Sequence, residues 1–167
     1  MKDDEVRPTG EPAGAPRHGQ TRPAHRILVA DDGSAVRQLM TAVLIGSGYH
    51  VDAAEDGAVA WEALQAKPYD LLITDHNMPK ITGVELVRNL RSARMALPVV
   101  LVTGTVPAHE LAKNPSLQLA AILEKPIAVA ELLDTVENVL RATDTPRQQD
   151  NPPSDWPEQP SAGGLQL

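Results

Sequence analysis

Residues 70–79 read Asp-Leu-Leu-Ile-Thr-Asp-His-Asn-Met-Pro, an apolar run that ends on a carboxylate and continues into a polar loop. A short, nearly continuous apolar run predicts a strand that is covered on both faces, as in a parallel sheet. Asp75 stands where this strand ends. The stretch therefore predicts a buried strand that brings a charged oxygen to one edge of a sheet.

Similar short apolar runs recur along the middle of the chain. Four of the five expected strands are nearly continuous apolar runs, whereas the second alternates apolar and polar residues and is typical of an edge strand. The expected strands are Arg26–Ala30, His50–Ala54, Asp70–Thr74, Pro98–Val102 and Ala120–Leu123.

Helical spacing fills the segments between these runs. The first expected helix is capped by Ser34 and is ended by Gly46 and Gly48. Its buried stripe is expected to consist of Val36, Leu39, Met40, Val43 and Leu44.

Four more helices are expected, one of them interrupted. The second stops before Pro68, the third opens near Thr82, and the last has clear helical spacing over residues 129–140. The fourth begins near His109 and is cut short by the pair Asn114-Pro115. Strands that alternate with helices predict an α/β fold, a doubly wound five-stranded parallel sheet with helices on both faces.

Composition sets the domain organisation and excludes some functions. Tails rich in Pro and Gly, residues 1–24 and 144–167, are expected to be disordered and flank one folded domain at 25–143. A formal net charge of −7 argues against a nucleic-acid binder. The absence of cysteine excludes thiolate metal sites. The N-terminus lacks the apolar region of a signal peptide, and the chain has no long apolar run. We therefore expect a soluble cytoplasmic protein that does not enter a membrane.

Polar side chains stand at the carboxyl ends of the expected strands. Asp31 and Asp32 follow the first strand, and Asp75 closes the third. Thr103 follows the fourth strand, and Lys125 comes shortly after the fifth. Because the carboxyl ends of parallel strands meet at one edge of the sheet, these side chains are expected to converge on a single crevice.

Three carboxylates in one crevice repel one another, and a hard divalent cation such as Mg²⁺ relieves that repulsion. Asp31 or Asp32, together with Asp75 and a main-chain carbonyl from the following loop, are the candidate ligands. Lys125 and Thr103 are suited to bind the oxygens of a phosphoryl group. The set fits phosphoryl transfer onto the carboxylate of Asp75.

Each of these residues also has a simpler interpretation. Asp31 and Asp32 precede Gly33-Ser34 and can be turn formers or a helix cap. Lys125-Pro126 can be an ordinary surface turn. The joint occurrence at the ends of four strands is what favours a functional site.

Four motifs occupy these strand ends: Ile-Leu-Val-Ala-Asp-Asp at 27–32, Leu-Leu-Ile-Thr-Asp-His-Asn-Met-Pro at 71–79, Leu-Val-Thr-Gly at 101–104 and Leu-Glu-Lys-Pro at 123–126. In order and spacing they resemble the receiver domain of bacterial two-component response regulators. The resemblance covers residues 26–143 and implies a flavodoxin-like sheet of the receiver type.

The resemblance also implies a role for the acidic residues. Asp75 matches the phosphoacceptor, which takes phosphate from a phosphohistidine on a sensor histidine kinase or a histidine phosphotransfer protein. Asp31 and Asp32 match the acidic pair of the family. Asp32 and Asp75 are the implied direct Mg²⁺ ligands, and the main-chain carbonyl of Asn77 completes the metal site.

Thr103 and Lys125 match the residues that hold the phosphoryl oxygens. By this resemblance the chain is a signalling phosphoacceptor, not an enzyme, that assists its own Mg²⁺-dependent phosphorylation and dephosphorylation. Only a short Pro-rich tail follows Thr143, so we expect a single-domain regulator that acts as a switch or a relay on an unidentified downstream protein.

Two departures from the family bear on how the phosphate is read out. Ile122 stands three residues before the lysine, where the family often carries Tyr or Phe. The break at Asn114-Pro115 falls in the fourth helix, which belongs to the usual signalling surface. His76, next to the acceptor, is expected to be a loop side chain that faces solvent.

Two other functions are compatible with the sequence. One is a receiver-like adaptor that binds partners without phosphorylation, which Ile122 would suit. The other is an aspartyl-nucleophile phosphatase of the haloacid dehalogenase type. That family has a second Asp two residues after the nucleophile, where this chain has Asn77, and its nucleophile lies on the first strand.

Overall fold

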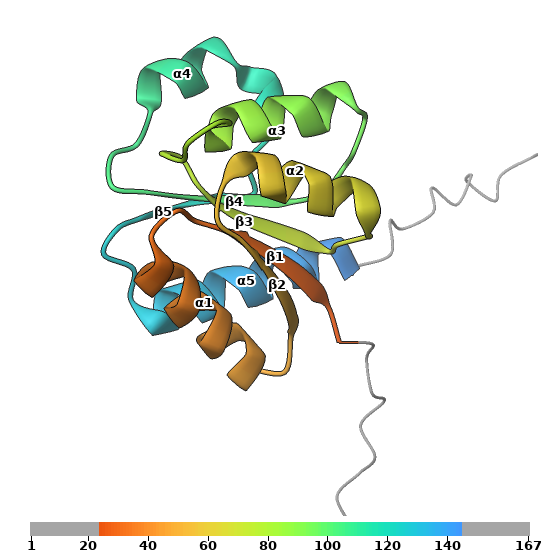
Figure 1. Ribbon diagram of the computed structural model, residues 1–167, viewed down its shortest axis with the longest axis vertical. Coiled ribbons are helices and arrows are strands. Elements are labelled where there is room, and N and C mark those ends of the chain that lie inside the picture. The colour runs from red at the N-terminus through yellow and green to blue at the C-terminus, as the bar shows by residue number, and fades with distance from the viewer. Residues whose placement is uncertain (1–23, 145–167) are drawn as a thin grey trace, which may run out of the picture.

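The computed structural model describes residues 24–144, which form one five-stranded parallel sheet in the order β2-β1-β3-β4-β5 (Figure 1). The predicted α/β fold and its doubly wound topology are confirmed. The strands are β1 Arg26–Ala30, β2 His50–Ala54, β3 Leu71–Asp75, β4 Val99–Thr103 and β5 Ala121–Glu124.

Helices cover both faces of this sheet. α1 and α5 pack on one face, and α2, α3 and α4 lie over the other (Figure 1). None of the helices within residues 24–144 has the length and apolar character that crossing a membrane requires. The helices are α1 Ser34–Gly46, α2 Gly57–Ala66, α3 Gly83–Ser92, α4 Ala108–Lys113 and α5 Val129–Asp144, with a 3₁₀ turn at Pro115–Leu117.

Strand β1 divides the core between the two faces. Ile27 and Val29 pack into the apolar cluster beneath α1 and α5, whereas Leu28 and Ala30 pack into the cluster beneath α2 and α3. Every residue of β3 and β4 is buried, and β2 is an edge strand, as its alternating pattern predicted. The prediction that the fifth strand is covered on both faces is wrong, because β5 forms the other edge of the sheet and only Leu123 of its four residues is buried. Because both faces are covered, the strand ends are the places left for polar chemistry.

Three strands end one residue later than the sequence pattern predicts. β3, β4 and β5 run to Asp75, Thr103 and Glu124. Parallel pairing continues to these residues, since Asp75 lies opposite Val102. Thr103 likewise lies opposite Glu124. The carboxylate of Asp75 and the hydroxyl of Thr103 therefore project from paired strand backbone, which fixes their positions more firmly than a loop would.

Two predictions for α1 are wrong. The N-cap residue is Gly33, without a side-chain cap hydrogen bond, and Ser34 is already the first residue of the helix. Leu39 is 55% exposed, although Met40 beside it is buried. Successive helical residues are turned by about 100°, which rotates Leu39 out of the stripe that faces the sheet.

The interrupted fourth helix is confirmed: α4 has six residues, none of them buried, and gives way to the 3₁₀ turn at Pro115. The tails that were predicted to be disordered lie outside the described residues, apart from Ala24 and Asp144. Asp144 still belongs to α5, one residue beyond the predicted domain boundary.

Gly83, the first residue of α3, packs directly against the backbone of Asp75. A Cβ atom at this position would lie 2.2 Å from the carbonyl oxygen of Asp75. We expect Gly83→Ala to destabilise the fold by about 1–3 kcal/mol, because neither backbone can give way cheaply. Gly46→Ala is the matched control, since nothing lies within 4 Å of its Cβ. Urea unfolding of both variants measures the difference, and equal stabilities would contradict the close packing.

Candidate functional site

Three carboxylates meet at the carboxyl edge of the sheet. Asp31 and Asp32 directly follow β1, and Asp75 ends the neighbouring strand β3. Each offers a ligand oxygen, and these oxygens all lie within 4.8 Å of one another. Asp31 is fully buried and Asp75 is 4% exposed, whereas Asp32 reaches solvent. The convergence predicted from the strand ends is therefore present for all three acids.

Lys125 brings a positive charge into this acidic cluster. Its Nζ atom lies 2.9 Å from Oδ2 of Asp31 and 3.3 Å from Oδ2 of Asp75. The residue directly follows β5, and its backbone N–H donates to the carbonyl of Thr103 at 2.9 Å. The ends of β1, β3 and β5 are thus joined through one ammonium group.

Asp31 is both a turn former and a member of the acidic cluster, the two roles that the sequence left open. Its Oδ1 atom accepts the N–H of Gly33 at 2.8 Å, which makes it a turn former at the start of α1. Its other oxygen, Oδ2, receives the ammonium of Lys125. Arg37 further fixes this turn by donating to the main-chain carbonyl of Asp31 at 2.6 Å.

The cluster shifts the ionisation of its members. Burial raises the pKa of the Asp75 carboxyl group; the Lys125 ammonium opposes this shift and the Asp31 charge adds to it. Burial disfavours the charged form of Lys125, but the hydrogen bond to Asp31 and the charges of both acids outweigh it, so the pKa of Lys125 is raised. The ionised form of Asp75 is therefore less favourable in the folded protein than it is in water.

The donor set fits a Mg²⁺ ion. Three carboxylates faced by the Lys125 ammonium leave excess negative charge in a largely buried site. Their oxygens are close enough to share one cation, and hard oxygen ligands are those that Mg²⁺ takes. A divalent ion would also offset the burial and the Asp31 charge that together raise the pKa of Asp75.

Thr103 lies at the predicted strand end, but its hydroxyl is engaged in the following loop. Oγ1 donates to the carbonyl of Thr105 at 2.8 Å and accepts its N–H at 3.3 Å. The side chain is fully buried. To reach a group bound at Asp75, the hydroxyl must exchange these loop contacts for new ones.

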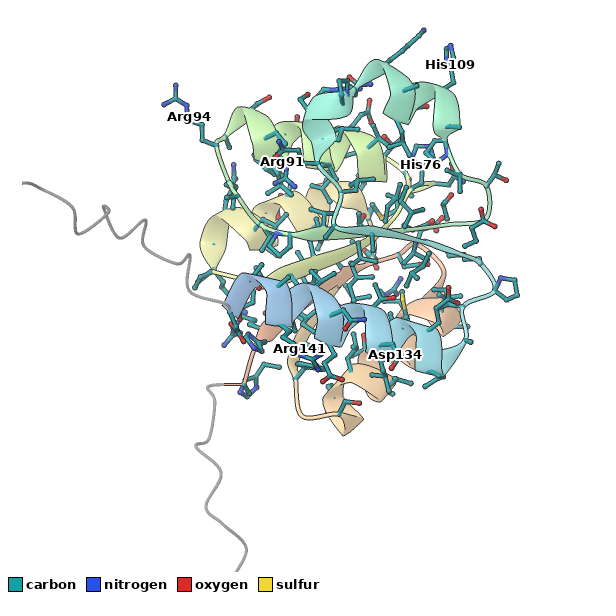
Figure 2. All side chains as sticks on the ribbon, turned by 180° about the vertical axis from the view of Figure 1, so that it is seen from behind. His76, Arg91, Arg94, His109, Asp134 and Arg141 are labelled. Carbon is teal, nitrogen blue, oxygen red and sulfur yellow. The ribbon has the colours of Figure 1, made fainter. Side chains whose placement is uncertain are left out.

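The prediction that His76 faces solvent is wrong for one of its ring nitrogens. Nδ1 is buried and has no hydrogen-bond partner within residues 24–144. The backbone N–H of His76 donates to the carbonyl of Val102, so strand-like pairing extends past Asp75. Successive residues of a strand point to opposite sides, and His76 lies on the side that carries α3 and α4 (Figure 2).

Sequence reasoning overlooked two residues beside the site, Asp56 and Lys80. Asp56 caps α2 by accepting the N–H groups of Ala58 and Val59, both at 2.9 Å. Its second oxygen pairs with Nζ of Lys80, in the loop between β3 and α3, at 2.5 Å. Asp before Gly57 at a helix start is a recognisable capping pattern, but its partner is 24 residues away and has no local signal.

The geometry agrees with the family comparison, in which the model of the response regulator receiver domain matches residues 27–137. The chain belongs to this family. It is a receiver domain of a two-component response regulator, a class of signalling phosphoacceptors rather than classical enzymes. Receiver domains take a histidine kinase as their partner.

Relatives of this receiver differ in how much of their length it covers. It is 35% identical over 117 residues to the response regulator receiver protein CpdR of Brucella abortus (strain 2308), covering 70% of this chain and 98% of CpdR. With the response regulator MprA of Mycobacterium sp. (strain KMS) it shares 34% over 127 residues, or 76% of this chain and 55% of MprA. With the sensor protein EvgS of Escherichia coli (strain K12) it shares 41% over 103 residues, or 62% of this chain and 9% of EvgS.

Solved structures have the same fold as this receiver. The chemotaxis response regulator CheY4 of Vibrio cholerae is 29% identical, with a TM-score of 0.64 and coverage of 70% of this chain and 99% of CheY4. A CheY-like receiver domain protein of Methanospirillum hungatei JF-1 has a TM-score of 0.68 at 22% identity, with coverage of 72% and 96%. At that identity the second likeness supports the fold alone.

The raised pKa of Asp75 predicts how the stability of the metal-free protein depends on pH. The folded-state pKa of Asp75 lies above the ordinary value of 3.8. The folded protein therefore loses stability as pH rises from 3.8 to the folded-state pKa, and its stability stays reduced at higher pH. Asp75→Asn should therefore be more stable than wild type at neutral pH without Mg²⁺. This advantage should vanish as pH falls below the ordinary value.

Thermal unfolding of wild type and Asp75→Asn with a chelator present, at neutral pH and at a pH below 3.8, measures the effect. Asp70→Asn is the control, because Asp70 directly precedes β3, at the end away from Asp75, and accepts the N–H of Arg26 at 2.8 Å. It should not gain stability at neutral pH. An Asp75→Asn variant that is no more stable than wild type would contradict the raised pKa.

Proposed function

We propose that this receiver, residues 25–143, accepts a phosphoryl group on Asp75 from a phosphohistidine of a sensor histidine kinase or a histidine phosphotransfer protein. The observation that carries the proposal is the environment of Asp75: a carboxylate at a strand end, clustered with Asp31 and Asp32 and paired with Lys125. The phosphorylated protein then acts as a switch or a relay toward a downstream protein.

In this reaction a carboxylate oxygen of Asp75 attacks the phosphorus atom. The P–N bond of the phosphohistidine breaks, its electron pair returns to the imidazole, and an acyl phosphate remains on Asp75. The ammonium of Lys125, already 3.3 Å from Asp75, is placed to bind an oxygen of the transferred group. Burial raises the pKa of the Asp75 carboxyl group and so makes its carboxylate more basic, while the Lys125 ammonium opposes this rise.

The carboxylates of Asp31, Asp32 and Asp75 and the main-chain carbonyl of Asn77 would hold Mg²⁺. When bound, the ion supplies charge neutralisation for the phosphoryl oxygens during transfer. Asp32, the exposed member of the cluster, leaves one side of the site open to the donor.

Labelling with a small-molecule acyl phosphate and Mg²⁺ tests the proposal. Wild type should be labelled, and removal of Mg²⁺ by a chelator should abolish the reaction. Asp75→Asn should not be labelled, whereas Asp70→Asn, altered directly before the other end of β3, should react as wild type does. Undiminished labelling of Asp75→Asn would overturn the assignment of the acceptor.

An adaptor function without a phosphorylation switch is the second candidate, and Ile122 favours it. Ile122 is 38% exposed on the edge strand β5 and lacks the ring that couples to the threonine in many receivers. A phosphorylation switch that needs no aromatic ring is nevertheless available through Thr103, whose hydroxyl is hydrogen-bonded to Thr105. A phosphoryl group that draws the Thr103 side chain toward Asp75 would break these bonds and release the loop before α4.

Amide NMR of Thr105 separates these two candidates. The switch predicts that the Thr105 resonance shifts on phosphorylation and that Thr103→Val, which still accepts label on Asp75, loses most of that shift. An adaptor predicts an unchanged Thr105 resonance and equal partner binding with and without label.

A further inference from the structure

The loop that contains Asn77, residues 76–82 between β3 and α3, is held at several points. At its ends, the N–H of Gly83 donates to the carbonyl of His76 at 2.9 Å, and Thr82 forms a reciprocal capping box with Glu85. In its centre Met78 is 6% exposed and belongs to the core beneath α2 and α3. The path of the backbone at Asn77 is therefore set by what restrains the loop on either side.

The start of α2 holds the second half of this loop. Lys80 has a φ of 68°, in the left-handed region that is costly for a residue with a side chain. Its Nζ atom bonds to Oδ2 of Asp56, whose carboxylate is only 5% exposed. The other oxygen of Asp56 is occupied by the N-cap of α2. One carboxylate thus joins the first turn of a helix to the metal-site loop.

Gly57 brings the same two segments into direct backbone contact. A Cβ atom at Gly57 would lie 2.1 Å from the carbonyl oxygen of Ile81 and 2.7 Å from its Cβ. Ile81 itself packs against the core beneath α2 and α3. The ion pair joins Asp56 to Lys80, and the backbone contact joins the next residues, Gly57 and Ile81. These two adjacent contacts are called the clamp below.

We propose that Asp56 and Lys80 are positioning residues for the metal site: their pairing sets the loop conformation in which the Asn77 carbonyl can bind Mg²⁺. This inference rests on the proposed function for the identity of the ion. Neither residue belongs to the acidic cluster of Asp31, Asp32 and Asp75. They act through the backbone of the loop, three residues along the chain from Asn77 in the case of Lys80.

Charge alone predicts the opposite result for one of the two residues, which makes the proposal testable. Removal of the Lys80 cation near an acidic site should strengthen Mg²⁺ binding if only Coulomb forces act. Positioning predicts that Lys80→Met weakens it. Asp56→Asn keeps a side-chain oxygen able to cap α2 but removes the charge that holds Lys80.

Calorimetric titration of the unphosphorylated protein with MgCl₂ is the measurement. We expect Lys80→Met and Asp56→Asn each to weaken Mg²⁺ binding about 3- to 10-fold, which is below the roughly 10- to 100-fold loss typical of groups that hydrogen-bond to a metal ligand directly, because both residues act through the loop backbone. The double variant should be no weaker than the worse single variant, because both changes open the same clamp. Lys80→Arg keeps the cation and should restore most of the affinity.

Lys67→Met is the matched control, since Lys67 is the C-cap residue of α2, at the opposite end of that helix from Asp56, and pairs with Asp52 at 3.3 Å. It should bind Mg²⁺ as wild type does. Hydrogen exchange in metal-free protein gives an independent readout: the amides of Ile81 and Gly83 should exchange faster in Lys80→Met and not in Lys67→Met.

Unchanged or tighter Mg²⁺ binding in Lys80→Met, with wild type binding normally, would overturn the positioning role and leave the proposed function intact. Failure of wild type itself to bind Mg²⁺ would overturn both. Weakening in Lys80→Met together with additive loss in the double variant would also contradict the clamp, because it would mean that the two residues act separately.

Discussion

The contact of the Lys125 ammonium with the carboxylates of Asp31 and Asp75 is the interaction on which this site depends. It joins the ends of β1, β3 and β5, of which β1 and β3 are neighbours in the sheet while β5 lies beyond β4. Two buried carboxylates side by side are unfavourable without a counter-charge, and the ammonium supplies one. Because the pairing is incomplete, with three acids to one cation, the cluster retains an attraction for a divalent ion.

The parallel register of the buried strands sets where these groups lie. Burial of every residue in β3 and β4 leaves polar groups to gather at one edge, and the register of β3 with β4 sets Asp75 beside Val102. The same packing that places Asp75 at this edge also disfavours its ionised form, since burial raises its pKa. A divalent cation bound beside Asp75 would recover part of the stability that this burial costs.

Local patterns in the sequence were enough to predict the sheet, its edge strand β2 and the three acids, because each depends on a run of neighbours and on where that run stops. They were not enough for features that arise between elements. The exposed face of Leu39 depends on how α1 is rotated against the sheet, and the buried ring nitrogen of His76 depends on pairing that continues beyond Asp75. The pair of Asp56 and Lys80 joins segments with no shared pattern, so only the folded chain reveals it.

The central claim is that Asp75 itself carries the phosphoryl group, and chemical mapping of the acyl phosphate tests it most directly. Borohydride reduces an aspartyl phosphate to homoserine, which peptide mass spectrometry can locate in the labelled protein. The account predicts homoserine at position 75, formed only when Mg²⁺ was present during labelling. Homoserine at Asp31, at Asp32 or at another acidic residue, or no homoserine in a labelled sample, would contradict it.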